Sequence, residues 1–211
     1  QARDREYFRE KIGSITSPAD LVKDFRLMRV ALGAYGLQDD VRNRAFIEKV
    51  LGDGVDNDEA LSNRLADKRY RAFSEAFGFG SSLPPRTQSP GFADRILARF
   101  EQQSFEIAVG EQNPDMRLAL TAVREVPDLA AADRSDSAAW FSVMGNPPLR
   151  QVFETAFALP KSIGTLDLDF QLGEFRKASE RVLGTSTFKD LQDPDLVDRL
   201  VRAFTLQSQL A

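Results

Sequence analysis

The chain repeatedly carries the signals that start an α-helix, and no stretch of useful length alternates as a β-strand does. At four places a capping residue is followed at once by proline: Ser17-Pro18, Asn113-Pro114, Asn146-Pro147 and Asp193-Pro194. A capping side chain accepts a hydrogen bond from an early helix amide, and proline fits the first turn because that turn needs no N–H from it. Apolar residues then recur every three or four positions. The sequence therefore predicts an all-α fold.

In the first half of the chain, two helices are expected before residue 53. The first begins after Ser17 and ends at Gly36, since glycine readily adopts the left-handed conformation that closes a helix. Asp39 is expected to cap the second helix, which covers about 40–51 and ends at Gly52. The residues expected to face the core from these helices are Leu21, Phe25, Met28, Leu32 and Tyr35, followed by Val41, Ala45, Phe46 and Val50.

Two more helices are expected before residue 80. The acidic turn GDGVDND over 52–58 is expected to cap a short helix near 57–65, and Asp67 to cap the next one. The aromatic residues that share the inward side of this last helix are Tyr70, Phe73 and Phe77.

The stretch GSSLPPRTQSPG over 80–91 is rich in proline, glycine and serine, so it interrupts the helical pattern. We expect a single helical domain over 1–211 in two packed halves, 17–80 and 92–207, joined by a loop at 81–91. The helices expected after the loop cover about 92–109, a segment starting at Asn113-Pro114, a short segment through Trp140 to Met144, and about 147–158, 166–183 and 194–207. The fold class is thus an irregular bundle of about nine to ten short and medium helices.

One phrase occurs three times, as NRLADKRYRAFSEAF (63–77), MGNPPLRQVFETAF (144–157) and LQDPDLVDRLVRAF (191–204). A second pairing lays AYGLQDDVRNRAF (34–46) over AVGEQNPDMRLAL (108–120). These pairings are consistent with an internal duplication. However, any helix that starts abruptly after a turn selects a cap, proline and an apolar stripe, so shared structure explains the phrase better than a shared binding role.

Composition excludes several classes of function. The chain has neither cysteine nor histidine, which removes disulfides, thiolate chemistry and the usual base of Ser and Cys hydrolases. The net charge of −4 argues against a nucleic-acid-binding protein, because such proteins normally present a basic surface. No apolar run reaches the length of a membrane-spanning helix, and the opening residues QARDREYFRE are too charged for a signal peptide. We therefore expect no nucleic-acid partner and no membrane insertion.

The acidic turn that contains Asp53, Asp56, Asp58 and Glu59 is a candidate site for a hard cation, because Ca²⁺ is bound by several oxygens from one loop. Its spacing does not match a helix–loop–helix calcium site, which needs acids at alternate positions, a central glycine and a glutamate at the twelfth position. Acids that stabilise the first turn of a helix are the favoured interpretation.

Three cations, Lys68, Arg69 and Arg71, form the densest basic cluster, with Tyr70 among them. Contact with phosphate or RNA is one interpretation of this cluster. A solvated helix face is the favoured one, because Tyr70 shares its side of the helix with inward aromatic residues and is not free to stack on a base.

Other candidate groups are weaker. The glycine pairs at 52/54 and 78/80 do not extend into a nucleotide-binding fingerprint. The paired carboxylates Asp167 and Asp169, or Asp39 and Asp40, could serve in acid–base chemistry, but neighbouring acids are common helix caps. We therefore assign no catalytic residue, no cofactor-binding residue and no metal ligand, and we expect no cofactor.

Two N-terminal segments, DFRLMRVALGAYGLQDDVRNRAFIEKVL (24–51) and NRLADKRYRAFSEAFGF (63–79), resemble an uncharacterised bacterial family. This domain of unknown function is often encoded among flagellar genes in alphaproteobacteria. FETAFALPKSIGTLDLDFQ (153–171) and the terminal LQDPDLVDRLVRAF are similar to the second half of the same family. The family has no established activity, so the resemblance implies no site residues.

The resemblance implies a helical protein that serves assembly, export or regulation, with a protein partner such as a flagellar component. We expect a non-enzymatic interaction protein that binds through an exposed apolar strip or a groove between its halves, located in the cytoplasm or at the flagellum, with export by a flagellar route also open. The alternative is an enzyme that uses a metal or carboxylates from the 53–59 turn or the 167–169 helix start. A third interpretation is a scaffold within a longer secreted polypeptide.

Overall fold

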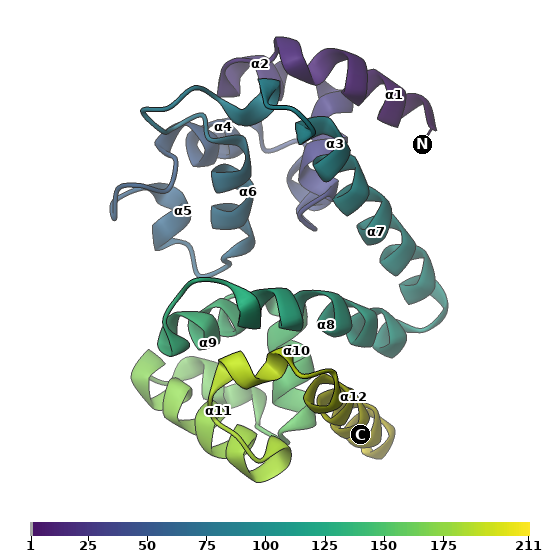
Figure 1. The fold of residues 1–211 in the computed structure, drawn as a ribbon, viewed down its shortest axis with the longest axis vertical. Helices are drawn as coiled ribbons and strands as arrows, with labels where there is room; N and C mark the ends of the chain where they lie inside the picture. The colour runs from purple at the N-terminus through teal and green to yellow at the C-terminus, as the bar shows by residue number, and fades with distance from the viewer. Residues whose placement is uncertain (1) are drawn as a thin grey trace. The chain divides into compact units, whose positions relative to one another are not determined.

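The structure, a computed structural model, describes residues 2–211. Every regular element in these residues is an α-helix or a 3-10 turn, and they contain no strand (Figure 1). The predicted all-α fold is therefore confirmed. Contacts divide the chain into two compact units, Gln1–Phe105 and Glu106–Ala211, which we call the N-terminal unit and the C-terminal unit.

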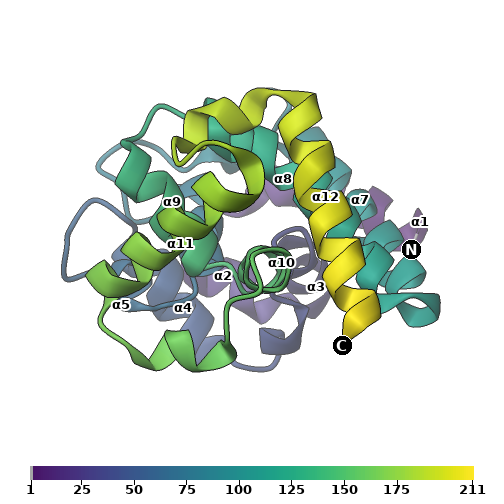
Figure 2. The same ribbon diagram turned by 90° about the horizontal axis from the view of Figure 1, so that it is seen from below.

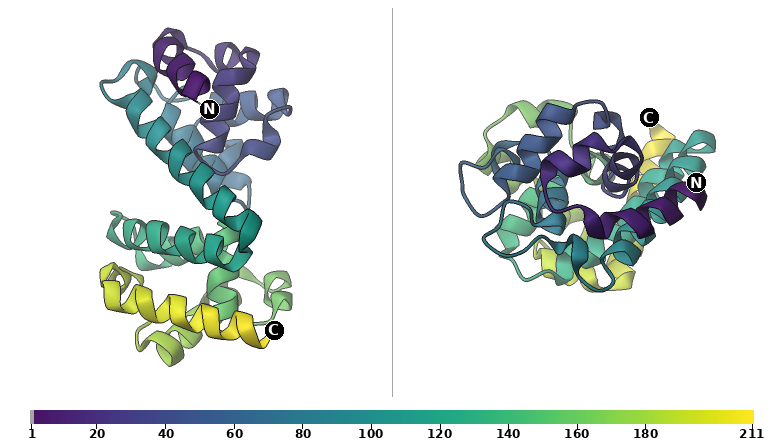
Figure 3. Two further views of the ribbon diagram at one scale, coloured as in Figure 1. Left: turned by 90° about the vertical axis from the view of Figure 1, so that its right-hand side faces the viewer. Right: turned by 90° about the horizontal axis from the view of Figure 1, so that it is seen from above.

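The boundary between the units lies within helix α7 (Phe92–Gln112), whereas the sequence analysis placed it at the 81–91 loop. Figure 3 shows α7 as one unbroken helix. The loop belongs to the N-terminal unit, because the buried hydroxyl of Thr87 donates a hydrogen bond to the carbonyl oxygen of Ile15 at 2.6 Å. Phe92, directly after the loop, is buried in the same core. A proline-rich stretch marks the end of a helix, but it does not mark the end of a core.

The N-terminal unit packs six helices and the start of α7 around one apolar core. Its helices are α1 (Ala2–Lys11), α2 (Pro18–Lys23), α3 (Phe25–Gly33), α4 (Arg44–Asp53), α5 (Leu61–Arg64) and α6 (Arg69–Phe77). Helix α3 contacts α1 and α2, and α4 contacts α2, α5 and α6. The residues described before Ser17 form a helix that the sequence analysis did not expect, which is one reason why the described residues hold twelve α-helices.

The helix expected between Ser17 and Gly36 is in fact two helices, because Asp24 ends α2 and begins α3. Asp24 has an extended backbone, and its carboxylate accepts a hydrogen bond from the amide of Leu27 at 3.1 Å. This break changes the direction of the residues that follow it. Phe25 is 42% exposed, so its expected place in the core is wrong, whereas the other four residues of that stripe are buried.

The next helix, α4, begins at Arg44, four residues later than expected. The residues before it form a 3-10 turn at Gln38–Asp40, and Asp39 makes no capping bond in the part of the chain that the structure describes. The later start changes which residues face inward. Ala45 is exposed, contrary to the expectation, and Ile47 is fully buried.

The C-terminal unit contains the last turns of α7 and five further helices. These are α8 (Pro114–Ala131), α9 (Asp136–Met144), α10 (Pro147–Ala156), α11 (Leu168–Leu183) and α12 (Pro194–Leu210). Helix α10 contacts each of the other four, and α12 also contacts α8. In Figure 2, α10 is seen nearly end-on with α11 and α12 on opposite sides of it.

An aromatic cluster occupies the core of this unit. The rings of Phe153 and Phe188 lie 5.8 Å and 5.0 Å from that of Trp140, and Phe175 lies 6.4 Å away. Trp140 is fully buried, and its indole N–H donates to the carbonyl oxygen of Ser186 at 3.0 Å. Because the chain has only one tryptophan, its fluorescence reports on the C-terminal unit alone.

The four predicted cap-and-proline starts are confirmed. Each capping side chain accepts a backbone amide two or three residues on: Ser17 from Asp20, Asn113 from Met116, Asn146 from Leu149 and Asp193 from Asp195. These bonds are local, which is why the sequence predicts them well.

The first copy of the repeated phrase is also built as a helix start. The carboxylate of Asp67 accepts the amide of Arg69 at 3.0 Å, a two-residue spacing like that of Asp193. Phe73 and Phe77 are fully buried, and Tyr70 packs against the same core, so the predicted inward stripe is confirmed. The proposed duplication stays a prediction.

Candidate functional site

The acidic turn at 53–59 is part of the fold of the N-terminal unit. The carboxylate of Asp53 accepts the first amide of α5, from Leu61, at 3.0 Å and lies 3.2 Å from the ammonium of Lys49. Both partners favour the ionised carboxylate and lower the pKa of Asp53, the hydrogen bond from Leu61 having the larger effect. Within residues 2–211, no set of three or more acidic side chains is arranged to hold a metal ion. The geometry thus favours helix capping over cation binding.

The glycine pairs on either side of this turn have a packing role that the sequence analysis missed. Gly54 has a φ of +67°, which disfavours any other residue there. A Cβ built on Gly80 would lie 2.8 Å from the carbonyl carbon of Asp53 and even closer to Gly54. The two chain segments therefore touch through their backbones, and this contact requires glycine at position 80.

The basic cluster on α6 is engaged in local bonds. The guanidinium of Arg69 pairs with Asp67 at 2.8 Å and donates to the carbonyl oxygen of Gly36 at 2.9 Å. Lys68 donates to a backbone carbonyl, and burial lowers its pKa. Arg71 pairs with Glu75 at 3.0 Å. These contacts support the interpretation as a structural helix face.

The pair Asp39 and Asp40 does not form a catalytic dyad. The carboxylate of Asp40 accepts hydrogen bonds from the hydroxyl of Tyr70 and from the side-chain amide of Asn43. Burial, followed by the bond to Asp40, raises the pKa of Tyr70 far above its usual value. Asp40 thus connects the turn before α4 to α6.

A buried ion pair near the start of the C-terminal unit was not foreseen. Glu106 is 1% exposed, and its two carboxylate oxygens accept from Arg124 at 2.7 Å and 2.9 Å, while Thr121 donates to it at 2.8 Å. Burial alone would lower the pKa of Arg124, but the pairing with Glu106 raises it. Both charges are satisfied within the fold, so the pair joins α7 to α8 and presents no free group.

The most distinctive surface feature is the segment Leu166–Phe170, with the sequence LDLDF, which we call the docking segment. Its three apolar side chains are exposed: Leu166 by 47%, Leu168 by 58% and Phe170 by 53%. In the described part of the chain, no other stretch of five residues exposes three large apolar side chains. Exposed apolar residues that gather in one place mark binding surfaces more often than scattered ones do.

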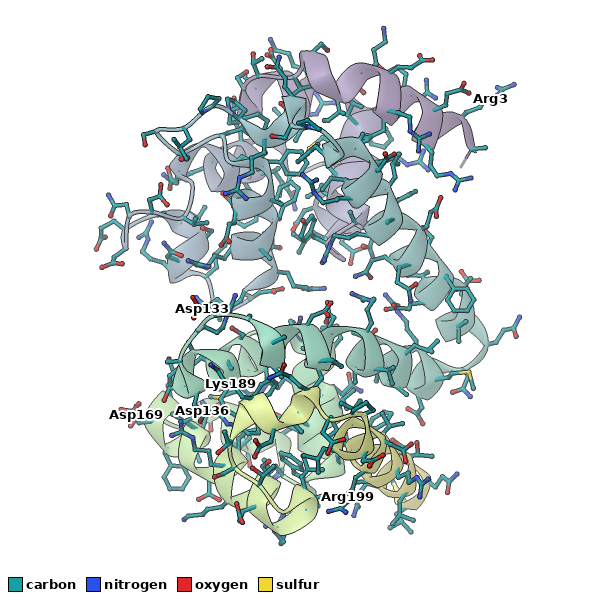
Figure 4. All side chains as sticks on the ribbon, in the orientation of Figure 1. Arg3, Asp133, Asp136, Asp169, Lys189 and Arg199 are labelled. Carbon is teal, nitrogen blue, oxygen red and sulfur yellow. The ribbon has the colours of Figure 1, made fainter. Side chains whose placement is uncertain are left out.

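The two acids of the docking segment have no partner. Asp167 occupies the cap position of α11, yet its side chain makes no capping bond. Neither Asp167 nor Asp169 forms an ion pair or a side-chain hydrogen bond with any described residue. Figure 4 shows Asp169 directed away from the ribbon of α11. Their negative charges are therefore available to a partner.

The backbone of the docking segment is fixed from inside the unit. The side chain of Gln171 is 3% exposed and donates to the carbonyl oxygen of Leu166 at 2.6 Å. Gln171 in turn accepts from the guanidinium of Arg150 at 2.7 Å, and Arg150 pairs with Glu154 at 2.6 Å. The amide of Leu166 donates to the carbonyl oxygen of the buried Ile163 at 3.1 Å. The exposure of the segment is therefore a property of a well-held structure.

The C-terminal unit as a whole is acidic. Residues 106–211 contain 16 Asp and Glu against 11 Lys and Arg, a net formal charge of −5. The docking segment adds apolar surface to this negative field, a combination suited to binding a partner. The sequence analysis noted the carboxylates at 167 and 169 but not the exposure of the residues between them. The alternation of apolar and acidic residues in LDLDF was the signal available.

Comparisons with known proteins agree with the fold and give no activity. Residues 34–197 match the model of a family described as "Protein of unknown function (DUF1217)". The crystal structure of protein AGR_C_984 from Agrobacterium tumefaciens is 32% identical in sequence, with a TM-score of 0.81, over 99% of this chain and 82% of that one. A search of curated proteins returned no match.

Proposed function

The chain belongs to the DUF1217 family of proteins of unknown function, and on this premise we propose that it is a non-enzymatic helical interaction or assembly protein of the bacterial flagellar system. The observation that carries the interaction role is the docking segment. It places three half-exposed apolar side chains on a backbone that is held by buried hydrogen bonds.

Energetics support this role. Burying a Leu or Phe side chain completely yields about 1.5–3 kcal/mol, so completing the burial of three half-exposed ones offers about 3 kcal/mol in total. A fixed backbone reduces the entropy lost on binding, because the segment is already in one conformation. A fold that keeps this surface exposed gives up that stabilisation unless a partner covers it.

The flagellar part of the proposal rests on the resemblance of segments 24–51 and 63–79 to a family often encoded among flagellar genes. A protein without a catalytic arrangement of its own fits a role in assembly or regulation. Agrobacterium, the source of the similar structure, belongs to the alphaproteobacteria, the class to which that resemblance points.

The test uses an alphaproteobacterium that swims and encodes this protein. We expect a deletion strain to swim poorly, wild-type protein to restore swimming, and the Leu168→Ser/Phe170→Ser variant to restore it incompletely. The matched control is Leu206→Ser/Leu210→Ser, which changes two apolar residues that are 57% and 72% exposed on α12. This control should restore swimming fully.

Co-purification supplies the second readout. The tagged wild-type chain should retain a flagellar component that the Leu168→Ser/Phe170→Ser variant loses. Normal swimming in the deletion strain, together with no flagellar protein retained by the wild-type chain, would refute the proposal.

A further inference from the structure

We infer that the partner surface recognised by the docking segment is apolar and bordered by Lys or Arg side chains, as on a basic amphipathic helix. This inference rests on the proposed function and adds the chemistry of the partner. It depends on three observations: the apolar exposure of the segment, the unpaired state of its two acids and the charge of the unit that presents it.

The apolar part of the partner follows from the alternation of the segment. Leu166 and Asp167 have extended backbones, with ψ of 166° and 140°, and side chains alternate in direction along an extended chain. Leu166 and Leu168 therefore lie on one side, with Asp167 between them on the other. Phe170 follows in the first turn of α11. A partner must offer an apolar surface to cover these side chains.

The basic part follows from charge complementarity. Most acids near other elements of this unit are paired: Glu106 with Arg124, Asp136 with Arg176 at 2.8 Å and Glu154 with Arg150. Asp167 and Asp169 are not paired. In a unit of net charge −5, an additional acidic surface would be repelled and a cationic one attracted. Cations beside the apolar contact would lie within reach of both carboxylates.

The test measures binding of the full chain to three synthetic helical peptides with the same leucine face. Their flanking residues are Lys in the first, Gln in the second and Glu in the third. Fluorescence anisotropy with labelled peptides should rank their affinities as Lys above Gln above Glu. The Leu168→Ser/Phe170→Ser variant should weaken binding of the Lys peptide by about 10-fold or more.

Charge reversal gives the sharpest readout. The variant Asp167→Lys/Asp169→Lys should reverse the preference, so that the Glu peptide binds better than the Lys peptide. The matched control, Asp56→Lys/Asp58→Lys, changes the net charge by the same amount at two exposed acids of the N-terminal unit that also lack ion pairs. It should preserve the preference for the Lys peptide. Asp167→Asn/Asp169→Asn should weaken the Lys peptide about fivefold at low salt, and less at high salt.

The outcomes separate this inference from the proposed function. Equal binding of all three peptides, lost in the Leu168→Ser/Phe170→Ser variant, would overturn the charge inference and leave the apolar docking role standing. Lys-peptide binding that survives that variant, or that is lost equally in the Asp56→Lys/Asp58→Lys control, would place the contact elsewhere and overturn the inference. Failure of the wild-type chain to bind any of the peptides would also overturn it. Because a reversed preference requires a folded surface, it cannot arise from loss of structure.

Discussion

Replacement of Gln171 by alanine should destabilise the C-terminal unit and release the docking segment, although residue 171 itself is buried. The substitution removes the acceptor of a charged hydrogen bond from Arg150 and the donor to the carbonyl oxygen of Leu166. A hydrogen bond to a charged group contributes about 1.5–3 kcal/mol and a neutral one about 0.5–1.5 kcal/mol. With the small cavity left behind, the free energy of unfolding should fall by about 3 kcal/mol.

Urea unfolding followed by the fluorescence of Trp140 measures this loss in the correct unit. For a slope of about 2 kcal/mol per molar urea, the transition midpoint should fall by about 1.5 M. Hydrogen exchange provides the second readout. The amide of Leu166, bonded to Ile163 in the wild-type chain, should exchange faster in the variant under native conditions.

The matched control is Gln192→Ala, which removes an exposed side-chain bond to the carbonyl oxygen of Lys189 at 3.1 Å. Its midpoint should change by less than about 0.25 M, because exposed substitutions of this kind usually change stability by under about 0.5 kcal/mol. A Gln171→Ala variant as stable as this control would refute the reasoning. So would a large loss of stability with unchanged exchange at Leu166, because Gln171 would then not fix the segment.

Two further predictions concern the N-terminal unit. Gly80→Ala should lower its melting temperature, because the added methyl group would overlap the backbone of Gly54; Gly52→Ala, with open space around it on α4, should be neutral or stabilising, and equal circular dichroism melting curves for the two would contradict the packing account. Tyr70→Phe should reduce alkaline sensitivity: the raised pKa of Tyr70 gives stability that is complete below about pH 10 and is lost as pH rises toward the folded-state pKa, so the wild-type chain should lose more stability than Tyr70→Phe in urea unfolding followed by circular dichroism at pH 8 and pH 11. An identical loss in both proteins would contradict the role of the bond to Asp40.

The features that the sequence predicted are those determined by neighbouring residues. The caps at Ser17, Asn113, Asn146 and Asp193 each bond to an amide two or three positions on, so the pattern and the structure share one cause. The inward stripe of α6 follows from helical periodicity in the same way.

The features that were missed depend on contacts between distant residues. The sequence analysis read 17–36 as one helix because the apolar spacing continues through Asp24, although an aspartate can also begin a helix there. The unit boundary inside α7 could not be foreseen, since a continuous helical pattern gives no sign of which core it contacts. Exposure of Leu166–Phe170 was missed for a similar reason: Arg150, on another helix, fixes Gln171 and thereby the backbone of that segment.

The central claim is that Leu166–Phe170 is the surface through which this chain binds its partner. Site-specific photo-crosslinking in swimming cells tests it most directly, with a photoreactive amino acid placed in the full chain at Leu168 and, as the control, at the more exposed Leu210. The account predicts a discrete crosslinked protein from position 168 that identifies a flagellar component, with no such product from position 210. A product from position 210 with none from position 168 would contradict the claim.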